Sequence, residues 1–121
     1  MNDIRPKTII CDIDGTLIVH TNPSSVARND AQPVLLQGTE EKLREWDKKG
    51  YNIILLTGRK ESLRKVTEEQ LAKVGIFYDQ LVMGIGGGKR YLINDRKIDS
   101  KENYAIAINI TRDKGLRDIE V

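Results

Sequence analysis

Two carboxylates stand two positions apart in the stretch 8–17, where Asp12 and Asp14 follow the apolar run 9–11. That run predicts a strand buried on both faces. The carboxylates would lie where the strand ends and turns, and in a parallel sheet this edge is where ligands bind. Two close carboxylates repel each other and attract a cation, and hard oxygen ligands suit Mg²⁺. The spacing therefore predicts a magnesium-assisted phosphoryl-transfer site.

Polar residues also follow two other predicted strands. Thr57 comes directly after the apolar run 51–56, and Asn94 and Asp95 come directly after the run 91–93. The C-terminal ends of parallel strands lie at one edge of the sheet. We therefore expect these residues to meet the two carboxylates in one pocket, although up to about 80 positions separate them in the sequence.

Each residue type in this set has a chemical reason to be there. Asp12 ends its strand and is best placed to attack phosphorus and form an acyl phosphate. Asp14 can protonate the leaving alkoxide and then deprotonate the attacking water. Asp95 can supply a magnesium ligand from another strand. The Thr57 hydroxyl can donate a hydrogen bond to a phosphoryl oxygen, and a lysine, for which Lys89 is the candidate, can supply positive charge.

Apolar runs and helical patterns alternate along the chain, which predicts an α/β fold with a mostly parallel sheet and right-handed crossovers. Leu43 and Trp46 share one helical face, and Gly50 and Gly75 stand where helices should end. A long loop is expected at 19–38 beside the carboxylates, with a glycine-rich loop at 84–88. The five expected strands are 7–12, 51–56, 80–83, 91–93 and 105–110, and the expected helices are 39–49 and 61–74.

The composition is that of an ordinary globular domain. The chain has 121 residues, 39% of them apolar and 31% charged, with a formal net charge of +2. This charge is too small to argue for nucleic acid or a membrane surface, and no apolar run approaches the length of a membrane span. The single cysteine, Cys11, falls in the first predicted strand and is expected to be a small buried residue. These features predict a single domain over 1–121 in the cytoplasm, with no membrane partner.

Four short motifs resemble those of the haloacid dehalogenase superfamily of phosphatases, in the same order, over about residues 8 to 110. The matching residues are Asp12-Ile13-Asp14-Gly15-Thr16 for the first motif, Leu56-Thr57-Gly58-Arg59 for the second, Lys89 for the third, and Asn94-Asp95 with Asp99 for the acidic fourth. The resemblance implies a three-layer α/β/α Rossmann-like core with five strands.

The resemblance also assigns roles. It implies that Asp12 is the nucleophile and Asp14 the general acid and base, and that Mg²⁺ is held by Asp12, the Asp14 backbone carbonyl and Asp95, with Asn94 in support. Thr57 and Lys89 would bind the phosphoryl group. Gly58, Arg59 and Arg90 are the candidate substrate-binding residues.

Two features depart from the commonest family pattern. A glycine-rich loop replaces the helix that often separates the third-motif lysine from the fourth motif, so that Arg90 is a substitute candidate for Lys89. This short spacing is similar to that of small phosphatases of capsule or lipopolysaccharide biosynthesis. The segments 17–38 and 60–88 are also too short for a cap domain. The chain therefore resembles a capless member with an open site, suited to a large substrate or to a homo-oligomer whose neighbouring subunit closes the pocket.

The resulting prediction is a magnesium-dependent phosphomonoesterase that forms an aspartyl-phosphate on Asp12. A phosphorylated small molecule, such as a sugar phosphate of surface-polysaccharide biosynthesis, is the first substrate expectation, and it rests on the resemblance. Two alternatives stay open: a 3′-end nucleic-acid phosphatase, and a non-catalytic module that binds phosphate or metal in a regulatory role. Alone, the Asp-x-Asp pair would also suit a calcium-like structural site or a polar turn.

Overall fold

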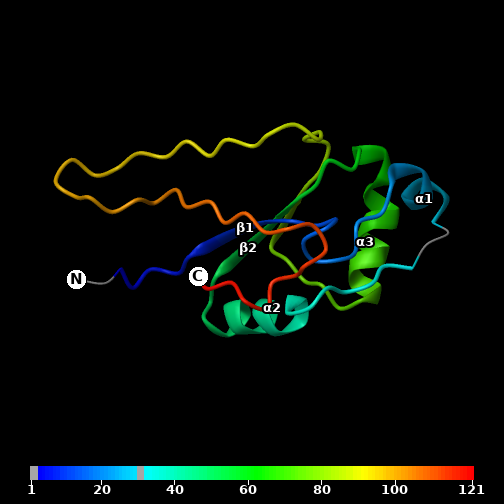
Figure 1. The fold of residues 1–121 in the computed structure, drawn as a ribbon, viewed down its shortest axis with the longest axis horizontal. Helices are drawn as coiled ribbons and strands as arrows, with labels where there is room; N and C mark the ends of the chain where they lie inside the picture. Colours follow the sequence, from blue (N-terminus) through cyan, green and yellow to red (C-terminus); the bar gives the residue numbers. More distant parts are fainter. Residues whose placement is uncertain (1–2, 30–31) are drawn as a thin grey trace.

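The protein, seen in a computed structural model that describes residues 3–29 and 32–121, has the predicted α/β architecture (Figure 1). Two residues of the expected 19–38 loop, Asp30 and Ala31, lie outside the described residues. In chain order the elements are β1 (Thr8–Asp12), α1 (Pro23–Arg28), α2 (Thr39–Lys48), β2 (Asn52–Leu56), the 3₁₀ helix η1 (Glu61–Leu63), α3 (Arg64–Lys73) and β3 (Gln80–Val82).

The three strands form one parallel sheet in the order β1-β2-β3, with β2 in the centre. The register pairs Asp12 with Leu56 across β1 and β2, and Leu56 with Val82 across β2 and β3. Parallel neighbours require a crossover connection, and α2 and α3 supply the two crossovers. The predicted strands at 7–12, 51–56 and 80–83 are thus confirmed to within two residues.

The predicted helices are confirmed, and their ends follow from local chemistry. Glu40 and Glu41 lie in the first turn of α2, where carboxylates favour the positive end of the helix dipole. Gly50 and Gly75 follow α2 and α3 with φ of +72° and +77°, a backbone conformation that glycine adopts without strain. Within the described ranges, no helix has the length and apolar character that crossing a membrane requires.

The expected loop at 19–38 contains a short helix that we did not predict. Asn22 caps α1, because its side-chain oxygen accepts a hydrogen bond from the Ser25 backbone N–H at 2.9 Å. Pro23 occupies the first turn, and Val26 is buried. The cap and the proline were readable in the sequence, but six residues are too few to show a helical period.

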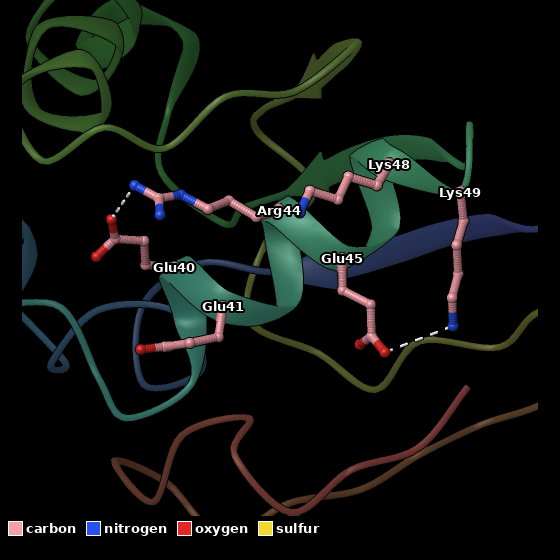
Figure 2. A pocket seen from close by; sticks show the side chains of 6 residues that line it. All are labelled: Glu40, Glu41, Arg44, Glu45, Lys48 and Lys49. Carbon is pink, nitrogen blue, oxygen red and sulfur yellow. Dashed lines mark hydrogen bonds and ion pairs between the residues drawn. The ribbon is translucent and has the colours of Figure 1, made fainter.

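The outward face of α2 carries alternating charges. Figure 2 shows six side chains of this helix and its end lining one pocket: Glu40, Glu41, Arg44, Glu45, Lys48 and Lys49. Arg44 pairs with Glu40 at 2.6 Å and Lys49 with Glu45 at 3.5 Å, each four residues apart on the helix. Such pairs support an exposed helix by a few tenths of a kcal/mol each, roughly 0.2–0.5. Four of these six charges pair along the helix in this way, and we assign the group to helix stability rather than to a ligand.

Only one face of the sheet is covered by helices. Cys11, Ile53 and Leu55 alternate along β1 and β2 and form one core with Leu43 and Trp46 of α2 and other buried side chains. The opposite face includes Ile10 and Val82, whose exposed fractions are 46% and 37%. The three-layer arrangement is therefore not present in the described chain, which has two layers.

The fourth and fifth predicted strands are also not formed in the described chain. Residues 87–110, which we call the arm, leave the sheet after the glycine-rich loop, double back and return, as the yellow-to-orange ribbon shows in Figure 1. Apolar residues in both limbs are largely exposed, including Tyr91, Ile93 and Ile106. A short apolar stretch is compatible with a strand, but a strand also needs a hydrogen-bonded partner, which local sequence does not specify.

The arm leaves β1 as an edge strand. The Asn52 N–H donates to the Lys7 carbonyl at 3.0 Å, so the peptide groups of Lys7, Ile9 and Cys11 face β2. Because peptide groups alternate in direction along a strand, those of Ile10 face away from the sheet. The peptide groups of Asp12 also face away from the sheet, so the first motif begins on an unpaired strand edge.

A C-terminal turn is fastened to the loop before α2 through two glycines. The Leu116 N–H donates to the Gln37 carbonyl at 2.7 Å, and Leu116 is buried. Gly115 has φ +83°, and a methyl group there would overlap the Gln37 carbonyl oxygen. Gly38 faces the Arg117 backbone in the same way.

Replacing Gly115 with alanine should therefore lower the free energy of unfolding by about 2–4 kcal/mol, the sum of left-handed backbone strain and steric displacement. Gly50→Ala is the matched control, since its φ is +72° but open space surrounds it. We expect a loss of only about 1–2 kcal/mol there. Denaturant unfolding of both variants measures the difference, and equal losses would show that the contact with Gln37 contributes nothing.

The prediction that Cys11 is buried is confirmed. Its exposed fraction is 7%, and burial, together with the charge of the neighbouring Asp12, raises the pKa of its thiol to about 12. Because the thiolate is the reactive form, the native thiol should stay neutral at pH 8 and resist alkylation. Maleimide labelling should be slow in buffer and reach one equivalent per chain in denaturant. Rapid labelling of the native protein would contradict the buried position.

Candidate active site

The first two motifs meet at the C-terminal edge of the sheet. Asp12 is the last residue of β1 and pairs with Leu56, the last residue of β2. Thr57, the next residue, therefore lies at the same edge, and it is buried. Its backbone N–H donates to the Val82 carbonyl at 2.9 Å, which extends the ladder to β3. The convergence expected from parallel strands holds for Asp12, Asp14 and Thr57.

Asp12 and Asp14 have different surroundings. The Asp12 side chain is 35% exposed and accepts a hydrogen bond from the Thr16 hydroxyl at 3.2 Å. The Asp14 side chain is 16% exposed, and both of its oxygens accept from the Arg59 guanidinium, at 2.8 and 2.9 Å. This two-pronged geometry is the strongest form of an ion pair between arginine and a carboxylate. The first carboxylate is thus open to a ligand, and the second is held in one orientation.

Arg59 itself is fixed from behind. Its side chain is 6% exposed, and one terminal nitrogen donates to Thr67 at 3.1 Å and to Gln70 at 2.9 Å, both on α3. The Gln70 amide donates in turn to Asn29 at 3.2 Å, at the end of α1. Sequence reasoning places Arg59 among the substrate-binding residues. In the structure its guanidinium points at Asp14 and joins the first motif to α3, and Gln70 extends the network to the end of α1.

Two basic residues compete for the role of the third motif. The Arg90 guanidinium donates to Asp12 Oδ1 at 2.9 Å. Lys89 is exposed and forms no hydrogen bond or ion pair with any residue in the described part of the chain. The structure thus brings Arg90, the substitute candidate, to the carboxylate and leaves Lys89 apart. Successive side chains of an extended segment point to opposite sides, so a shift of one residue is enough to exchange which of the two faces Asp12.

The second motif is held close to the glycine-rich loop. The Thr57 hydroxyl accepts a hydrogen bond from the Arg59 backbone N–H at 3.0 Å, and its own proton has no acceptor among the described residues. A methyl group on Gly58 would lie 2.8 Å from the Gly86 carbonyl oxygen. The Gly84 N–H donates to the Arg59 carbonyl at 2.7 Å. Gly58 therefore serves this close backbone approach, and the proton of the buried Thr57 hydroxyl is uncommitted among the described residues.

The fourth motif lies on the arm, away from the two carboxylates. Asn94 and Asp95 are exposed, and the Asn94 amide donates to Asp95 at 3.3 Å. Asp12 offers an open carboxylate to a metal ion. Within residues 3–29 and 32–121, however, no three acidic, histidine or cysteine side chains gather closely enough to hold one. The described arrangement therefore supplies part of a magnesium site and does not fit the complete set.

One basic residue at the site, Arg112, was missed by sequence reasoning. The Asp113 N–H donates to the Gly15 carbonyl at 2.9 Å, so this turn lies against the first motif. Arg112 crosses over Gly15, since a methyl group on Gly15 would lie 3.1 Å from Arg112 Cγ. No local pattern predicts this contact, because it joins segments almost 100 residues apart.

Known structures resemble the chain in part. Two chains from the solved structures "Structure of Pnkp1/Rnl/Hen1 complex" and "Structure of the Pnkp1/Rnl/Hen1 RNA repair complex" are 35% and 33% identical, with TM-scores of 0.57 and 0.56. The matches cover 71% and 82% of this chain but only 30% and 28% of those chains. This chain thus spans less than a third of their length.

A structure from Vibrio cholerae, titled "Crystal Structure of MCSG Target APC26283", is 23% identical with a TM-score of 0.51, over 76% of this chain and 82% of that one. Its likeness supports the fold alone. No curated protein sequence matches this chain.

A family model described as "PITM 1-3, LNS2 domain" matches residues 9–111. The match contains Asp12, Asp14, Thr57 and Asp95 and includes the sheet except for Thr8, the first residue of β1. The chain belongs to this LNS2 domain family, whose fold is of the haloacid dehalogenase-like phosphatase type.

Proposed function

We propose that this chain hydrolyses phosphomonoesters in two steps, with Asp12 as the nucleophile. The observation that supports the proposal is the register of β1 and β2: both strands end at one edge of the sheet, where the partly exposed Asp12 ends β1 and Thr57 directly follows β2. A carboxylate and a hydroxyl donor at one sheet edge suit attack on phosphorus and orientation of its oxygens. The LNS2 family fold agrees with this chemistry.

In the first step an Asp12 oxygen attacks phosphorus and the ester P–O bond breaks. Asp14 gives a proton to the leaving alkoxide. Water then attacks the aspartyl-phosphate, Asp14 takes its proton, and the products are inorganic phosphate and free Asp12. Each Asp14 oxygen accepts one hydrogen bond from Arg59 and keeps a second lone pair for this proton transfer.

Arg90 is proposed to stabilise the transferring group. Its guanidinium lies 2.9 Å from Asp12 Oδ1 and is 38% exposed, so it can turn from the carboxylate to a phosphoryl oxygen. Fixed positive charge at that position offsets charge that develops in the transition state. Lys89 stays the alternative from the resemblance.

Mg²⁺ is proposed as the cofactor on the resemblance and on the acceptor chemistry of the site. Asp12, the Asp14 backbone carbonyl and Asp95 would hold it, with Asn94 in support, and it would neutralise repulsion between carboxylate and phosphate. A complete set requires the arm to bring Asp95 to the sheet edge. A single capless domain, a cytoplasmic location and a homo-oligomer that closes the open site also stay proposals.

The substrate class has two candidates. A sugar phosphate follows from the resemblance to small phosphatases of surface-polysaccharide pathways. A 3′-phosphorylated nucleic acid is favoured by a specific observation, namely 35% identity to a chain of a complex that contains Pnkp1, Rnl and Hen1, and 33% to a chain of the complex titled as RNA repair. The small net charge of +2 argues for contact with only a short stretch of nucleic acid.

The experiment is hydrolysis of an aryl phosphate with Mg²⁺, without it and with a chelator, followed by sugar phosphates and oligonucleotides with a 3′-phosphate. We expect phosphate release that depends on Mg²⁺, and a higher kcat/KM for one of the two substrate classes. If the chain turns over none of these substrates but still binds phosphate, the proposal of an enzyme is wrong and a non-catalytic binding module is favoured.

A further inference from the structure

The C-terminal turn at 111–116 is built against the first motif. Its Asp113 has φ +64°, in the left-handed region, and its N–H donates to the Gly15 carbonyl at 2.9 Å. The Asp113 side chain accepts from the His20 backbone N–H, also at 2.9 Å. The turn is therefore attached to residues on both sides of Thr16, and buried Leu116 anchors its far end.

This attachment carries Arg112 across Gly15. A methyl group on Gly15 would lie 3.1 Å from Arg112 Cγ and 3.7 Å from its Nε. Gly15 has φ +85° as well, so both the backbone angle and the arginine exclude a side chain there. Arg112 is exposed and, among residues 3–29 and 32–121, its guanidinium forms no hydrogen bond or ion pair.

The neighbouring charges are already paired. Asp12 pairs with Arg90, and Asp14 pairs with Arg59. Asp113 is engaged with the His20 N–H. Among the described residues, Arg112 thus has no counterion, and the backbone of Asp113 holds it beside the first motif.

We propose that Arg112 determines specificity by binding a second phosphate group of the substrate, next to the phosphoryl group that Asp12 attacks. This proposal rests on the proposed phosphatase function. Arg90 is already paired with Asp12, whereas Arg112 lies against Gly15 on the other side of the first motif's turn. A guanidinium presents parallel donors that match two phosphate oxygens, and an unpaired one is ready to accept an anion. The second phosphate is either a backbone phosphodiester of a nucleic acid or the other phosphate of a sugar bisphosphate.

The test compares wild type with Arg112→Gln on paired substrates that differ by one phosphate. The pairs are a nucleoside 3′-monophosphate with the 3′,5′-bisphosphate, and a sugar monophosphate with its bisphosphate. We expect Arg112→Gln to lower kcat/KM on the doubly phosphorylated member of the preferred pair by about 10- to 100-fold, through KM. Hydrolysis of both monophosphates and of an aryl phosphate should change less than about twofold.

Lys114→Gln is the matched control, because it removes the same charge from the same turn. Like Arg112, Lys114 is exposed. Lys114→Gln should leave kcat/KM for both members of each pair within about twofold of wild type, since salt screens a charge that does not contact the substrate. Arg112→Lys should restore part of the preference. An equal loss on mono- and bisphosphates, or an equal effect of Lys114→Gln, would overturn the specific role of Arg112.

Failure of the enzyme function can be separated from failure of this inference. If wild type releases no phosphate, calorimetry can still measure the contribution of the second phosphate to affinity. The two nucleotides and the two sugar phosphates are titrated into wild type and into Arg112→Gln. We expect tighter binding of one bisphosphate and loss of that advantage in the variant. Equal affinities in the two proteins would overturn the proposal whether or not the chain is an enzyme.

Discussion

Asp12→Asn should reduce phosphomonoester turnover by roughly 10⁴-fold or more, since an amide oxygen is a poor nucleophile and cannot form the acyl phosphate. The loss should fall on kcat. The fold should stay intact, because the side chain is 35% exposed and contacts only Thr16 and Arg90 through hydrogen bonds. Initial rates and circular dichroism measure the two effects.

The control for this substitution is Asp118→Asn. That side chain is 86% exposed and pairs only with the adjacent Arg117. It should leave turnover and unfolding unchanged. Full activity of Asp12→Asn would exclude the aspartyl-phosphate route, and trapping of labelled phosphate on the wild-type chain but not on this variant would support it.

Arg59→Met should lower the free energy of unfolding by about 3–5 kcal/mol. The methionine can fill the space, but it leaves the partly buried Asp14 carboxylate without its partner. It also removes the hydrogen bonds that Arg59 donates to Thr67 and Gln70. Turnover should fall as well, because the orientation of Asp14 is lost. Arg59→Lys should lie between, since an ammonium keeps the charge but cannot bond both oxygens in parallel.

Arg64→Met is the matched control for Arg59→Met. Arg64 begins α3 and pairs with Glu61 and Glu68, but the three side chains are 37–61% exposed. Exposed ion pairs contribute about 0–1 kcal/mol, so the expected loss is small. Combining Arg59→Met with Asp14→Asn should destabilise less than the sum of the two. Additive losses, or unchanged stability with a raised KM, would return Arg59 to a substrate-binding role.

The sequence predicts the parts of the fold that local pattern determines. Apolar runs before Asp12 and Thr57 predict β1 and β2, although Ile10 lies on an exposed face, and left-handed glycines after α2 and α3 end those helices. The arm is where the prediction is wrong, because the apolar stretches at 91–93 and 105–110 are compatible with a strand but do not supply its pairing partner. The expected second helical layer rests on the family resemblance alone.

The candidate site divides in the same way. Asp12 and Thr57 come together because parallel register is a simple rule. Arg59 was assigned to substrate because the motif shows only that it follows Thr57, and its direction depends on partners on α3. Arg112 gave no signal at all, because its position is set by a turn that folds back onto Gly15.

The unpaired side of β1 has a consequence for the chemistry. Its outward peptide groups include those of Ile10, and the strand ends at the residue that would attack phosphorus. A chain that added to this edge in register would run along β1 and arrive beside Asp12. Strand addition at this edge and access to the nucleophile are therefore linked, because a segment that paired with β1 would also limit which substrates can approach the Asp12 carboxylate.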